Sequence, residues 1–350
     1  MPPKSQYEAL LARVFQTGQL TNRGPLVTEL EESLKSYLGV SHLQTMANGT
    51  LALQAGLKAL GLENGEIITT PFSYVATVGS ILWERCTPIF VDIEPSNYTM
   101  DAHQLEKAIS PHTRAIMPVH VFGYACDVDG IAKIAEHHGL PVIYDAAHAF
   151  GSRYRGRSLL DYGDICICSL HATKLFHTGE GGVCVARDEQ LYKRLDLIKR
   201  FGHSGDDHIC LGFNAKMSEL HAAMGLAVLP FLNDNLAARK VLSERYDALL
   251  ASSVARPSPQ PGLDYNYAYY PILLRDELQR ERSMAALAVK NIFARRYFYP
   301  SLNTLSYLPQ SRQSCPVSEN ISSRILCLPF FPGLTDEELT LIADTVVESL

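Results

Sequence analysis

The stretch DICICSLHATKLFHTGEGGVCVA, residues 164–186, decides the fold. It begins with the apolar run Ile165–Cys168, continues into a polar loop that contains Lys174, and closes with a second apolar run from Gly182 to Ala186. Cys166 and Cys168 alternate with β-branched residues, which is a strand pattern. We therefore expect two buried strands with a lysine-bearing loop between them.

Similar runs precede this stretch and alternate with helical patterns. Asp101 and Asp127 stand at expected N-cap positions, and Gly139 is a suitable residue to follow the end of the second helix. The expected strands occupy residues 67–70, 88–93, 115–121 and 141–146. Strand and helix in alternation predict an α/β fold with a mostly parallel sheet flanked by helices.

The chain changes character after this region. Helical patterns cover residues 218–224 and continue beyond Pro230 to Leu250, where prolines and Gly262 interrupt the sequence. The remaining residues mix helical and strand patterns. We expect a large α/β domain over residues 1–235, including the N-terminal segment, and a smaller α+β domain over residues 236–350.

Composition excludes several classes of protein. The 350 residues are 47% apolar and 19% charged, which excludes a disordered chain. Lysine plus arginine is 31 and aspartate plus glutamate is 37, which gives a net charge of −6. The chain lacks the basic excess that is typical of nucleic-acid-binding proteins, so we expect no nucleic acid partner. No secretory signal or membrane-length apolar stretch is evident, and we expect a cytoplasmic protein with no membrane partner.

Cysteine and histidine provide no sign of a disulfide framework or a metal site. The eight cysteines include no CxxC pair, and we expect them to be reduced and mostly buried. Twelve histidines include the adjacent pair His137-His138 and the loop residues His203 and His208. None of them has the spacing of a zinc motif, so no metal is predicted.

Three segments place reactive residue types at the ends of expected elements. Gly49 and Thr50 begin a helix, where backbone N–H groups can bind phosphate. Asp145 follows a buried strand, although a capping aspartate would look the same. Lys174 follows another strand and is a candidate Schiff-base residue, although a solvated loop lysine is the alternative. Together they are the set that pyridoxal 5'-phosphate (PLP) requires.

The order of the motifs resembles the DegT/StrS family of sugar aminotransferases. The segments are NGT (48–50), TPFSYVAT (70–77), DAAHAFG (145–151), SLHATKLFHTGEGG (169–182) and GFNAKMSELHAAMG (212–225). The resemblance covers the chain from about Gly24 to the C-terminus and implies a fold-type-I PLP enzyme. Together with RRYFYPSLN (295–303), the lysine segment looks most like the branch that aminates TDP-4-keto-6-deoxyhexoses.

The resemblance implies a role for each matching residue. Lys174 would bind the cofactor covalently and then carry the proton that moves during transamination. Asp145 would pair with the pyridine nitrogen, and Tyr74 would lie on the face of the ring. His148 would donate to the phenolic oxygen in place of a glutamine. The phosphate would be held by Gly49, Thr50 and Ser169, and by Asn214 of the second subunit of a homodimer with shared active sites.

Two departures from the family pattern concern the substrate side. Asn214-Ala-Lys216-Met replaces a commoner Asn-Tyr-Arg-Met, so Lys216 need not act as the arginine does. Arg295 and Arg296 are hypothesised to contact the diphosphate of a nucleotide sugar, because guanidinium pairs well with phosphate oxygens. Tyr299 is a candidate sugar contact. A surface arginine pair and core tyrosines are the alternatives.

The predicted reaction follows from the resemblance. L-glutamate would donate its amino group to a dTDP-linked 4-keto-6-deoxyhexose, giving a 4-amino-4,6-dideoxy sugar and 2-oxoglutarate. Amination at C3, a PLP-dependent sugar dehydratase and a catalytically silent regulatory protein on the same scaffold remain open. Relatives that dehydrate carry histidine at the position of Lys174, so the lysine argues against that chemistry.

Overall fold

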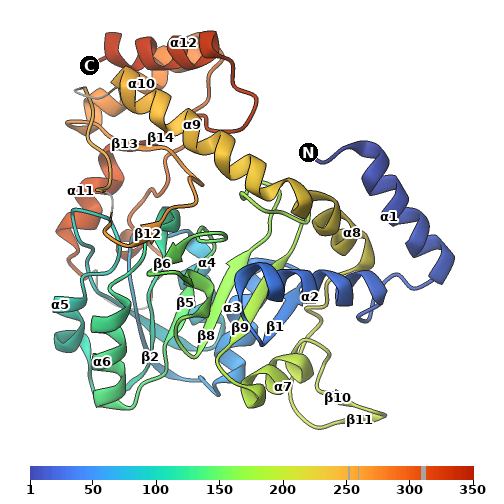
Figure 1. Cartoon of the computed structure of the whole chain (residues 1–350). Coiled ribbons are helices and arrows are strands. Elements are labelled where there is room, and N and C mark those ends of the chain that lie inside the picture. The colour runs from blue at the N-terminus through green and yellow to red at the C-terminus, as the bar shows by residue number, and fades with distance from the viewer. Residues whose placement is uncertain (251–252, 259, 309–312) are drawn as a thin grey trace.

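The computed structural model describes residues 1–250, 253–258, 260–308 and 313–350 (Figure 1). The helices are α1 (Lys4–Thr17), α2 (Pro25–Leu38), α3 (Gly49–Ala59), α4 (Val75–Trp83), α5 (Ala102–Leu105), α6 (Val128–His138), α7 (Glu189–Ile198), α8 (Glu219–Val228), α9 (Leu232–Leu250), α10 (Glu277–Val289), α11 (Pro316–Arg324) and α12 (Asp336–Glu348). The strands are β1 (Leu43–Met46), β2 (Gly65–Thr69), β3 (Cys86–Phe90), β4 (Thr113–Met117), β5 (Ile143–Asp145), β6 (Arg153–Tyr154), β7 (Arg157–Ser158), β8 (Ile165–Ser169), β9 (Gly182–Ala186), β10 (His203–Ser204), β11 (Asp207–His208), β12 (Leu263–Asp264), β13 (Pro271–Leu273) and β14 (Ile325–Cys327).

The main sheet confirms the predicted α/β architecture. Its strands run in the order β3-β2-β4 and β5-β8-β9-β1, and parallel bridges Ile116–Val142 and Val119–Asp145 join the two groups. Strands β3, β2 and β4 are parallel, as are β5 and β8, whereas β9 is antiparallel to both of its neighbours. A mostly parallel sheet brings the carboxyl ends of several strands to one edge, where ligands bind in this class of fold.

Helices cover both faces of the sheet, and the strand residues alternate between two cores. Ile165 and Ile167 pack with α3 and α7 on one face. Cys166 and Cys168 pack on the opposite face, where the core includes residues of α2, α6 and α8. This alternation explains why β8 is apolar at every position. Gly56 of α3 lets the helix approach β8, because a Cβ there would lie 3.1 Å from Cδ1 of Ile167.

Most predicted helix ends are confirmed by capping contacts. The side chain of Asp127 accepts a hydrogen bond from the backbone N–H of Gly130, and Gly139 follows α6 with φ of 63°. Asp101 caps α5 in the same way, but α5 has only four residues and continues as a 3-10 turn. Strand β1 was not predicted, because its polar residues Gln44 and Thr45 hide the apolar pattern.

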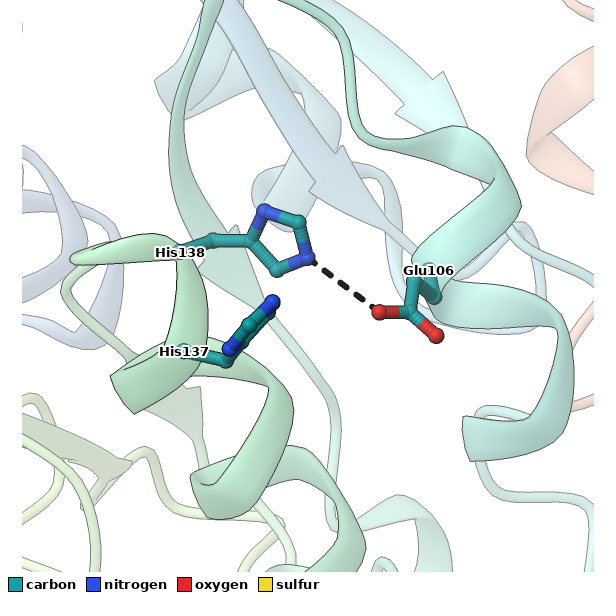
Figure 2. Close-up of side chains that lie close together, drawn as sticks. All are labelled: Glu106, His137 and His138. Atoms are coloured by element: carbon teal, nitrogen blue, oxygen red, sulfur yellow. Dashed lines mark hydrogen bonds and ion pairs between the residues drawn. The ribbon is translucent and has the colours of Figure 1, made fainter.

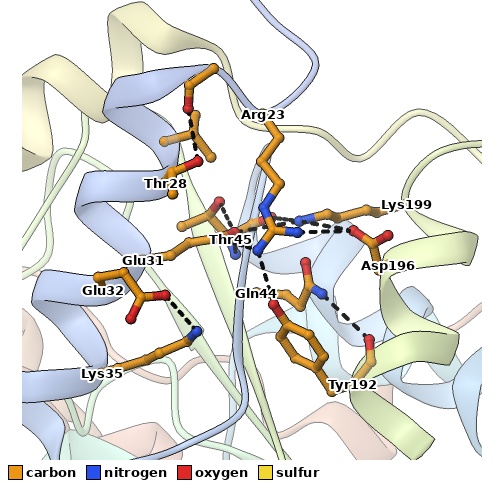
Figure 3. A network of polar contacts seen from close by, with 12 residues as sticks. Arg23, Thr28, Glu31, Glu32, Lys35, Gln44, Thr45, Tyr192, Asp196 and Lys199 are labelled. Carbon is orange, nitrogen blue, oxygen red and sulfur yellow. Dashed lines mark hydrogen bonds and ion pairs between the residues drawn. The ribbon is translucent and has the colours of Figure 1, made fainter. Parts of the chain in front are cut away.

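A buried ion network connects α2, β1 and the end of α7 (Figure 3). Oε1 of the fully buried Glu31 accepts hydrogen bonds of 2.9 Å from both the backbone N–H and the hydroxyl of Thr45. Nζ of Lys199 lies 3.4 Å from Oε1, and the Arg23 guanidinium lies 3.0 Å from Oε2. Burial lowers the pKa of Lys199, although the charge of Glu31 opposes this shift.

The same network fixes the turn that follows β1. The backbone N–H of Ala215 donates to the carbonyl of Lys199, and the N–H of Ala47 donates to the carbonyl of Ala215. These bonds connect Lys199 to the chain that leads directly into Asn48, Gly49 and Thr50. Backbone hydrogen bonds that begin at Lys199 therefore support the turn predicted to bind phosphate.

The C-terminal residues form a third core around the second half of α9. Leu242 and Tyr246 of α9 pack with Ile272 of β13, Leu326 of β14 and Ile342 of α12. Helix α9 runs from the main sheet to this region, as Figure 1 shows. The domain boundary predicted at residues 235–236 falls within α9 and stays a prediction. Among the described residues, no helix combines the length and apolarity that crossing a bilayer requires.

Candidate active site

A cavity of about 280 Å³ lies at the carboxyl ends of β5 and β8 and at the first turn of α3. Seven of the residues predicted for the cofactor site line it. They are Gly49, Thr50, Tyr74, Asp145, His148, Ser169 and Lys174. These residues come from separate positions along the chain, and the strand order of the sheet brings them together. The predicted grouping is therefore present, and its chemistry can be examined residue by residue.

One end of the cavity is built to receive an anion. Asn48 caps α3, and its side chain accepts from the N–H of Leu51 at 2.8 Å. The N–H groups of Gly49 and Thr50 belong to the first helical turn, which has no intrahelical acceptors for them. A Cβ at position 49 would lie 3.0 Å from Cβ of Ser169, so glycine allows the turn and the end of β8 to meet. Backbone N–H groups and a serine hydroxyl therefore lie close together at the cavity, an arrangement that suits phosphate binding.

Asp145 is a buried carboxylate held in one orientation. Its Oδ2 accepts a 2.7 Å hydrogen bond from the hydroxyl of Thr77, and its Oδ1 accepts one of 3.1 Å from the N–H of Ala147. Burial raises the pKa of Asp145, and both hydrogen bonds and the charge of Lys174 act in the opposite direction. A buried carboxylate with an open side is suited to binding a protonated ring nitrogen.

Lys174 is a half-buried amine that faces the same cavity. Burial lowers the pKa of Lys174, which favours the neutral, nucleophilic form of the amine. Its Nζ donates a 3.1 Å hydrogen bond to the hydroxyl of Tyr269. The solvated loop lysine considered as an alternative would be exposed and would lack such a partner.

His148 is buried between aromatic rings, and one of its nitrogens has a defined role. The N–H of Phe122 donates to Nδ1 of His148 at 3.2 Å, so in the neutral ring the proton is on Nε2. Burial, with a smaller contribution from Lys174, places the pKa of His148 well below its ordinary value. The ring stacks on Phe298 with centroids 5.2 Å apart. His148 therefore offers a fixed Nε2–H donor.

Tyr74 immediately precedes α4 and lines the cavity with 59% of its surface exposed. Tyr74 is therefore more exposed than an aromatic residue of the core would be. Asn214 is exposed, accepts a 2.6 Å hydrogen bond from Nζ of Lys216, and does not line the cavity of its own chain.

The predicted substrate residues lie next to the cavity along the chain but do not line it. Arg296 stacks on Tyr299, with its guanidinium carbon 3.3 Å from the ring centroid, and lies 3.6 Å from Glu277. Arg295 is exposed and pairs with Cys327 through its backbone. The residues that follow, Tyr297 and Phe298, do line the cavity.

Sequence reasoning missed several contributors to the site. Tyr269 and Phe298 belong to the C-terminal part of the chain, and only the fold brings them to the cavity. Thr77 lies three residues after Tyr74, on the helix that follows it, and its hydroxyl contacts Asp145. Thr77 is the last residue of the TPFSYVAT motif. Its position three residues after Tyr74 was the one feature of the sequence that could have identified it as a site residue.

Within the described residues, one group of three possible metal ligands lies close together (Figure 2). The ligand atoms of Glu106, His137 and His138 lie within 4.8 Å of one another, and all three residues are exposed. Nε2 of His138 lies 3.4 Å from Oε1 of Glu106. The histidines occupy the last turn of α6. The group lies outside the cavity of Lys174.

The groups around this cavity fit the parts of PLP. The turn at Gly49 suits the phosphate, and the oriented carboxylate of Asp145 suits the ring nitrogen. The Nε2–H of His148 suits the phenolic oxygen, and the amine of Lys174, with its lowered pKa, suits the aldehyde. Such a site on a mostly parallel sheet defines the class of fold-type-I PLP-dependent aminotransferases. The sequence profile of the DegT/DnrJ/EryC1/StrS aminotransferase family matches residues 4–347. The chain belongs to this family.

Individual relatives agree with that assignment. A dTDP-4-amino-4,6-dideoxy-D-glucose transaminase of Shigella dysenteriae is 39% identical, over 99% of this chain and 96% of the relative. The crystal structure of DesI with its TDP-sugar product has a TM-score of 0.94 and 32% identity, covering 99% of this chain and 90% of that one. The PLP form of the sugar aminotransferase Spr1654 from Streptococcus pneumoniae has a TM-score of 0.92 and 25% identity, covering 99% and 97%.

Proposed function

We propose that this aminotransferase moves an amino group from L-glutamate to a dTDP-linked 4-keto-6-deoxyhexose. The products would be a 4-amino-4,6-dideoxy sugar nucleotide and 2-oxoglutarate. The observation that carries the proposal is the convergence of Lys174, Asp145 and the Gly49–Thr50 turn on one cavity. The sugar is proposed from the similarity to a relative named for dTDP-4-amino-4,6-dideoxy-D-glucose and to a structure that contains a TDP-sugar product.

The residues of the cavity would have different roles in proton transfer and in binding the cofactor ring. Bound PLP supplies the electron sink that makes the carbon next to the amino group acidic. Nζ of Lys174 would accept that proton and later give it back, a positioned transfer of the kind worth about 10²–10⁴ in rate. The carboxylate of Asp145 would hold a protonated ring nitrogen, and Nε2–H of His148 would donate to the phenolic oxygen.

Binding and orientation would come from the remaining residues. The N–H groups of Gly49 and Thr50 and the hydroxyl of Ser169 would bind the phosphate, and Tyr74 would cover one face of the ring. Tyr74 is suited to this role because it lines the cavity and is 59% exposed in the single chain.

The working unit is proposed to be a homodimer with shared active sites. Asn214 is exposed and does not line its own cavity, which supports a role in the site of the second subunit. Exposed apolar side chains on the same segment, Phe201, Ile209 and Leu211, support burial of this region against another chain. Mixing Lys174→Ala with Asn214→Ala should restore one intact site per mixed dimer. No recovery despite demonstrated subunit exchange would contradict the shared site.

Arg295, Arg296 and Tyr299 are proposed contacts for the nucleotide sugar. They flank Tyr297 and Phe298, which line the cavity, and guanidinium groups suit a diphosphate. Replacing Arg295 or Arg296 with alanine should raise KM for the sugar nucleotide about tenfold and leave KM for glutamate unchanged.

A cytoplasmic location is proposed in addition. Its support is that all eight cysteines are free and seven are buried.

The experiment that tests the function is a panel of dTDP-, GDP- and UDP-linked keto sugars, each with L-glutamate, read by product mass and NMR. We expect nitrogen at C4 of a dTDP-linked 6-deoxyhexose. Nitrogen at C3 would refute the position of amination, and loss of water from the sugar without nitrogen transfer would indicate a dehydratase. A protein that binds PLP but converts no sugar would favour a regulatory role on this scaffold.

A further inference from the structure

The hydroxyl of Tyr269 lies 3.1 Å from Nζ of Lys174 and accepts its hydrogen bond. Nζ also lies 5.8 Å from the centroid of the Tyr269 ring. Tyr269 lines the cavity, yet it lies 95 residues further along the chain, in the segment between β12 and β13. In the described part of the chain, this hydroxyl is the hydrogen-bond partner found for Nζ of Lys174.

The segment that carries Tyr269 is anchored on several sides. The guanidinium of the buried Arg239 donates to the carbonyls of Tyr267 at 3.3 Å and Ala268 at 3.2 Å. The side-chain amide of Asn266 donates to the carbonyl of His148 at 2.7 Å. This amide bond connects the segment directly to the turn that follows Asp145. Such an anchored backbone holds the phenol at a fixed distance from the loop of Lys174.

The ring of Tyr269 is fixed by aromatic neighbours as well. It meets His148 edge to face with centroids 5.1 Å apart, Phe122 at 5.5 Å and Tyr297 at 5.8 Å. These contacts leave the phenol little freedom to turn, because packed aromatic rings keep one rotamer. The position of the hydroxyl is therefore set before any ligand arrives.

We propose that Tyr269 is a positioning residue for Lys174, and that the hydroxyl of Tyr269 holds the free amine in one position within the cavity between proton transfers. This inference rests on the proposed function. A phenol accepts from an ammonium group and donates to the lone pair of a neutral amine, so one residue serves both states of Lys174. The phenol exchanges no proton with the substrate and forms no bond to it.

The surroundings of Lys174 support this assignment. Burial raises the pKa of Tyr269, which favours the protonated phenol. Other ionisable groups also face the amine, but their effect is through charge. These groups are Asp145, His148, Cys168, Tyr74 and Tyr297. Among the described residues, the hydrogen bond found for Nζ is the one to the hydroxyl of Tyr269.

The test compares Tyr269→Phe with Tyr270→Phe. The first change removes the hydroxyl and keeps the ring. The second removes the hydroxyl of the adjacent residue, which donates to Asp247 at 2.8 Å and belongs to the third core instead of the cavity. Three readouts are taken: the rate at which the apoprotein captures PLP covalently, the rate of the glutamate half-reaction at saturation, and the thermal midpoint.

We expect Tyr269→Phe to slow both rates about ten- to a hundredfold, with the final PLP occupancy and thermal midpoint close to those of the wild type. Tyr270→Phe should keep both rates. Wild-type rates in Tyr269→Phe would overturn the inference while the function stands. A wild-type protein that captures PLP but is unchanged by glutamate would overturn the function itself.

A second measurement covers the case in which Tyr269→Phe fails to fold. Difluorotyrosine placed at position 269 keeps the size of the ring and lowers the pKa of the hydroxyl. The pH profile of the glutamate half-reaction should then gain an ionisation that the wild type lacks. An unchanged profile would count against contact between the phenol and the working amine.

Discussion

The hydroxyl of Thr77 donates a 2.7 Å hydrogen bond to Oδ2 of Asp145, and both residues are buried. The hydroxyl of Ser73, just before α4, lies 2.7 Å from that of Thr77, so a short chain of hydroxyl groups leads to the carboxylate. Burial alone would favour a protonated Asp145. The hydrogen bond from Thr77 opposes this effect and lowers the pKa of Asp145, which favours the charged carboxylate.

Thr77→Val should weaken cofactor binding and move its pH dependence. Removing the hydroxyl raises the pKa of Asp145 further, so the carboxylate becomes protonated at a higher pH. The acid limb of PLP retention therefore shifts upward, and the PLP dissociation constant at neutral pH rises about tenfold. A pH series of PLP dissociation constants measures both. Thr77→Ser keeps the hydroxyl and should behave as the wild type, and identical limbs for all three proteins would contradict the role of Thr77.

Gly49→Ala should weaken the binding of PLP through the phosphate. The added Cβ would meet Cβ of Ser169 at 3.0 Å and its Cα at 3.3 Å, so the turn or the end of β8 must shift. We expect the PLP dissociation constant to rise about ten- to a hundredfold. Gly79→Ala is the matched control, because a Cβ there meets nothing within 4 Å. Equal PLP affinity in the two variants, measured by equilibrium dialysis, would show that Gly49 is not part of the phosphate site.

Lys199→Met should destabilise the fold, because it leaves the buried carboxylate of Glu31 with fewer partners. Arg23 still faces Glu31, so we expect a loss of about 2–4 kcal/mol, somewhat less than for an isolated buried pair. Denaturant unfolding measures it. Adding Glu31→Gln removes the unpaired charge and should recover part of the loss. The exposed Lys193→Met should cost little, and a Lys199→Met variant as stable as that control would contradict this account of the network.

His120 should make the protein sensitive to acid. Burial lowers the pKa of His120 to about 3, whereas the pKa of a histidine in an unfolded chain is about 6.5. Between these values the unfolded chain binds more protons, so stability falls as the pH is lowered through that window. The contribution of His120 between pH 7 and pH 5 is about 2 kcal/mol.

Urea unfolding at pH 7 and pH 5 tests this contribution. His120→Asn should lose less stability between the two values than the wild type. The His120→Asn variant should still lose some stability at pH 5, because burial lowers the pKa of His148 as well. The exposed His112→Asn should keep the wild-type pH dependence. A His120→Asn protein with an unchanged difference between pH 5 and pH 7 would refute the prediction.

Much of the fold could be predicted from local patterns. The alternation of Cys166 and Cys168 with isoleucines identified β8, and Asp127 and Gly139 marked the two ends of α6. Strand β1 was missed because Gln44 and Thr45 are polar, although both are fully buried. Thr45 is satisfied by Glu31, and a contact across 14 residues leaves no periodic signal in the sequence.

The site was predictable where its residues follow strands or begin helices. Asp145 and Ser169 end β5 and β8, Lys174 lies in the loop after β8, and Gly49 and Thr50 begin α3. Tyr269 has no such signature, because it lies in a tyrosine-rich segment where any ring could have faced the core. Its contact with Lys174 depends on how the C-terminal region packs against the sheet. Arg295, Arg296 and Tyr299 stay predictions.

The central claim is that PLP binds covalently to Lys174, and borohydride reduction followed by peptide mass mapping tests it most directly. We expect wild-type protein incubated with PLP to carry one reduced adduct, on the peptide that contains Lys174. Lys174→Ala should carry none there. An adduct confined to another lysine such as Lys216, or no adduct at all, would contradict the account.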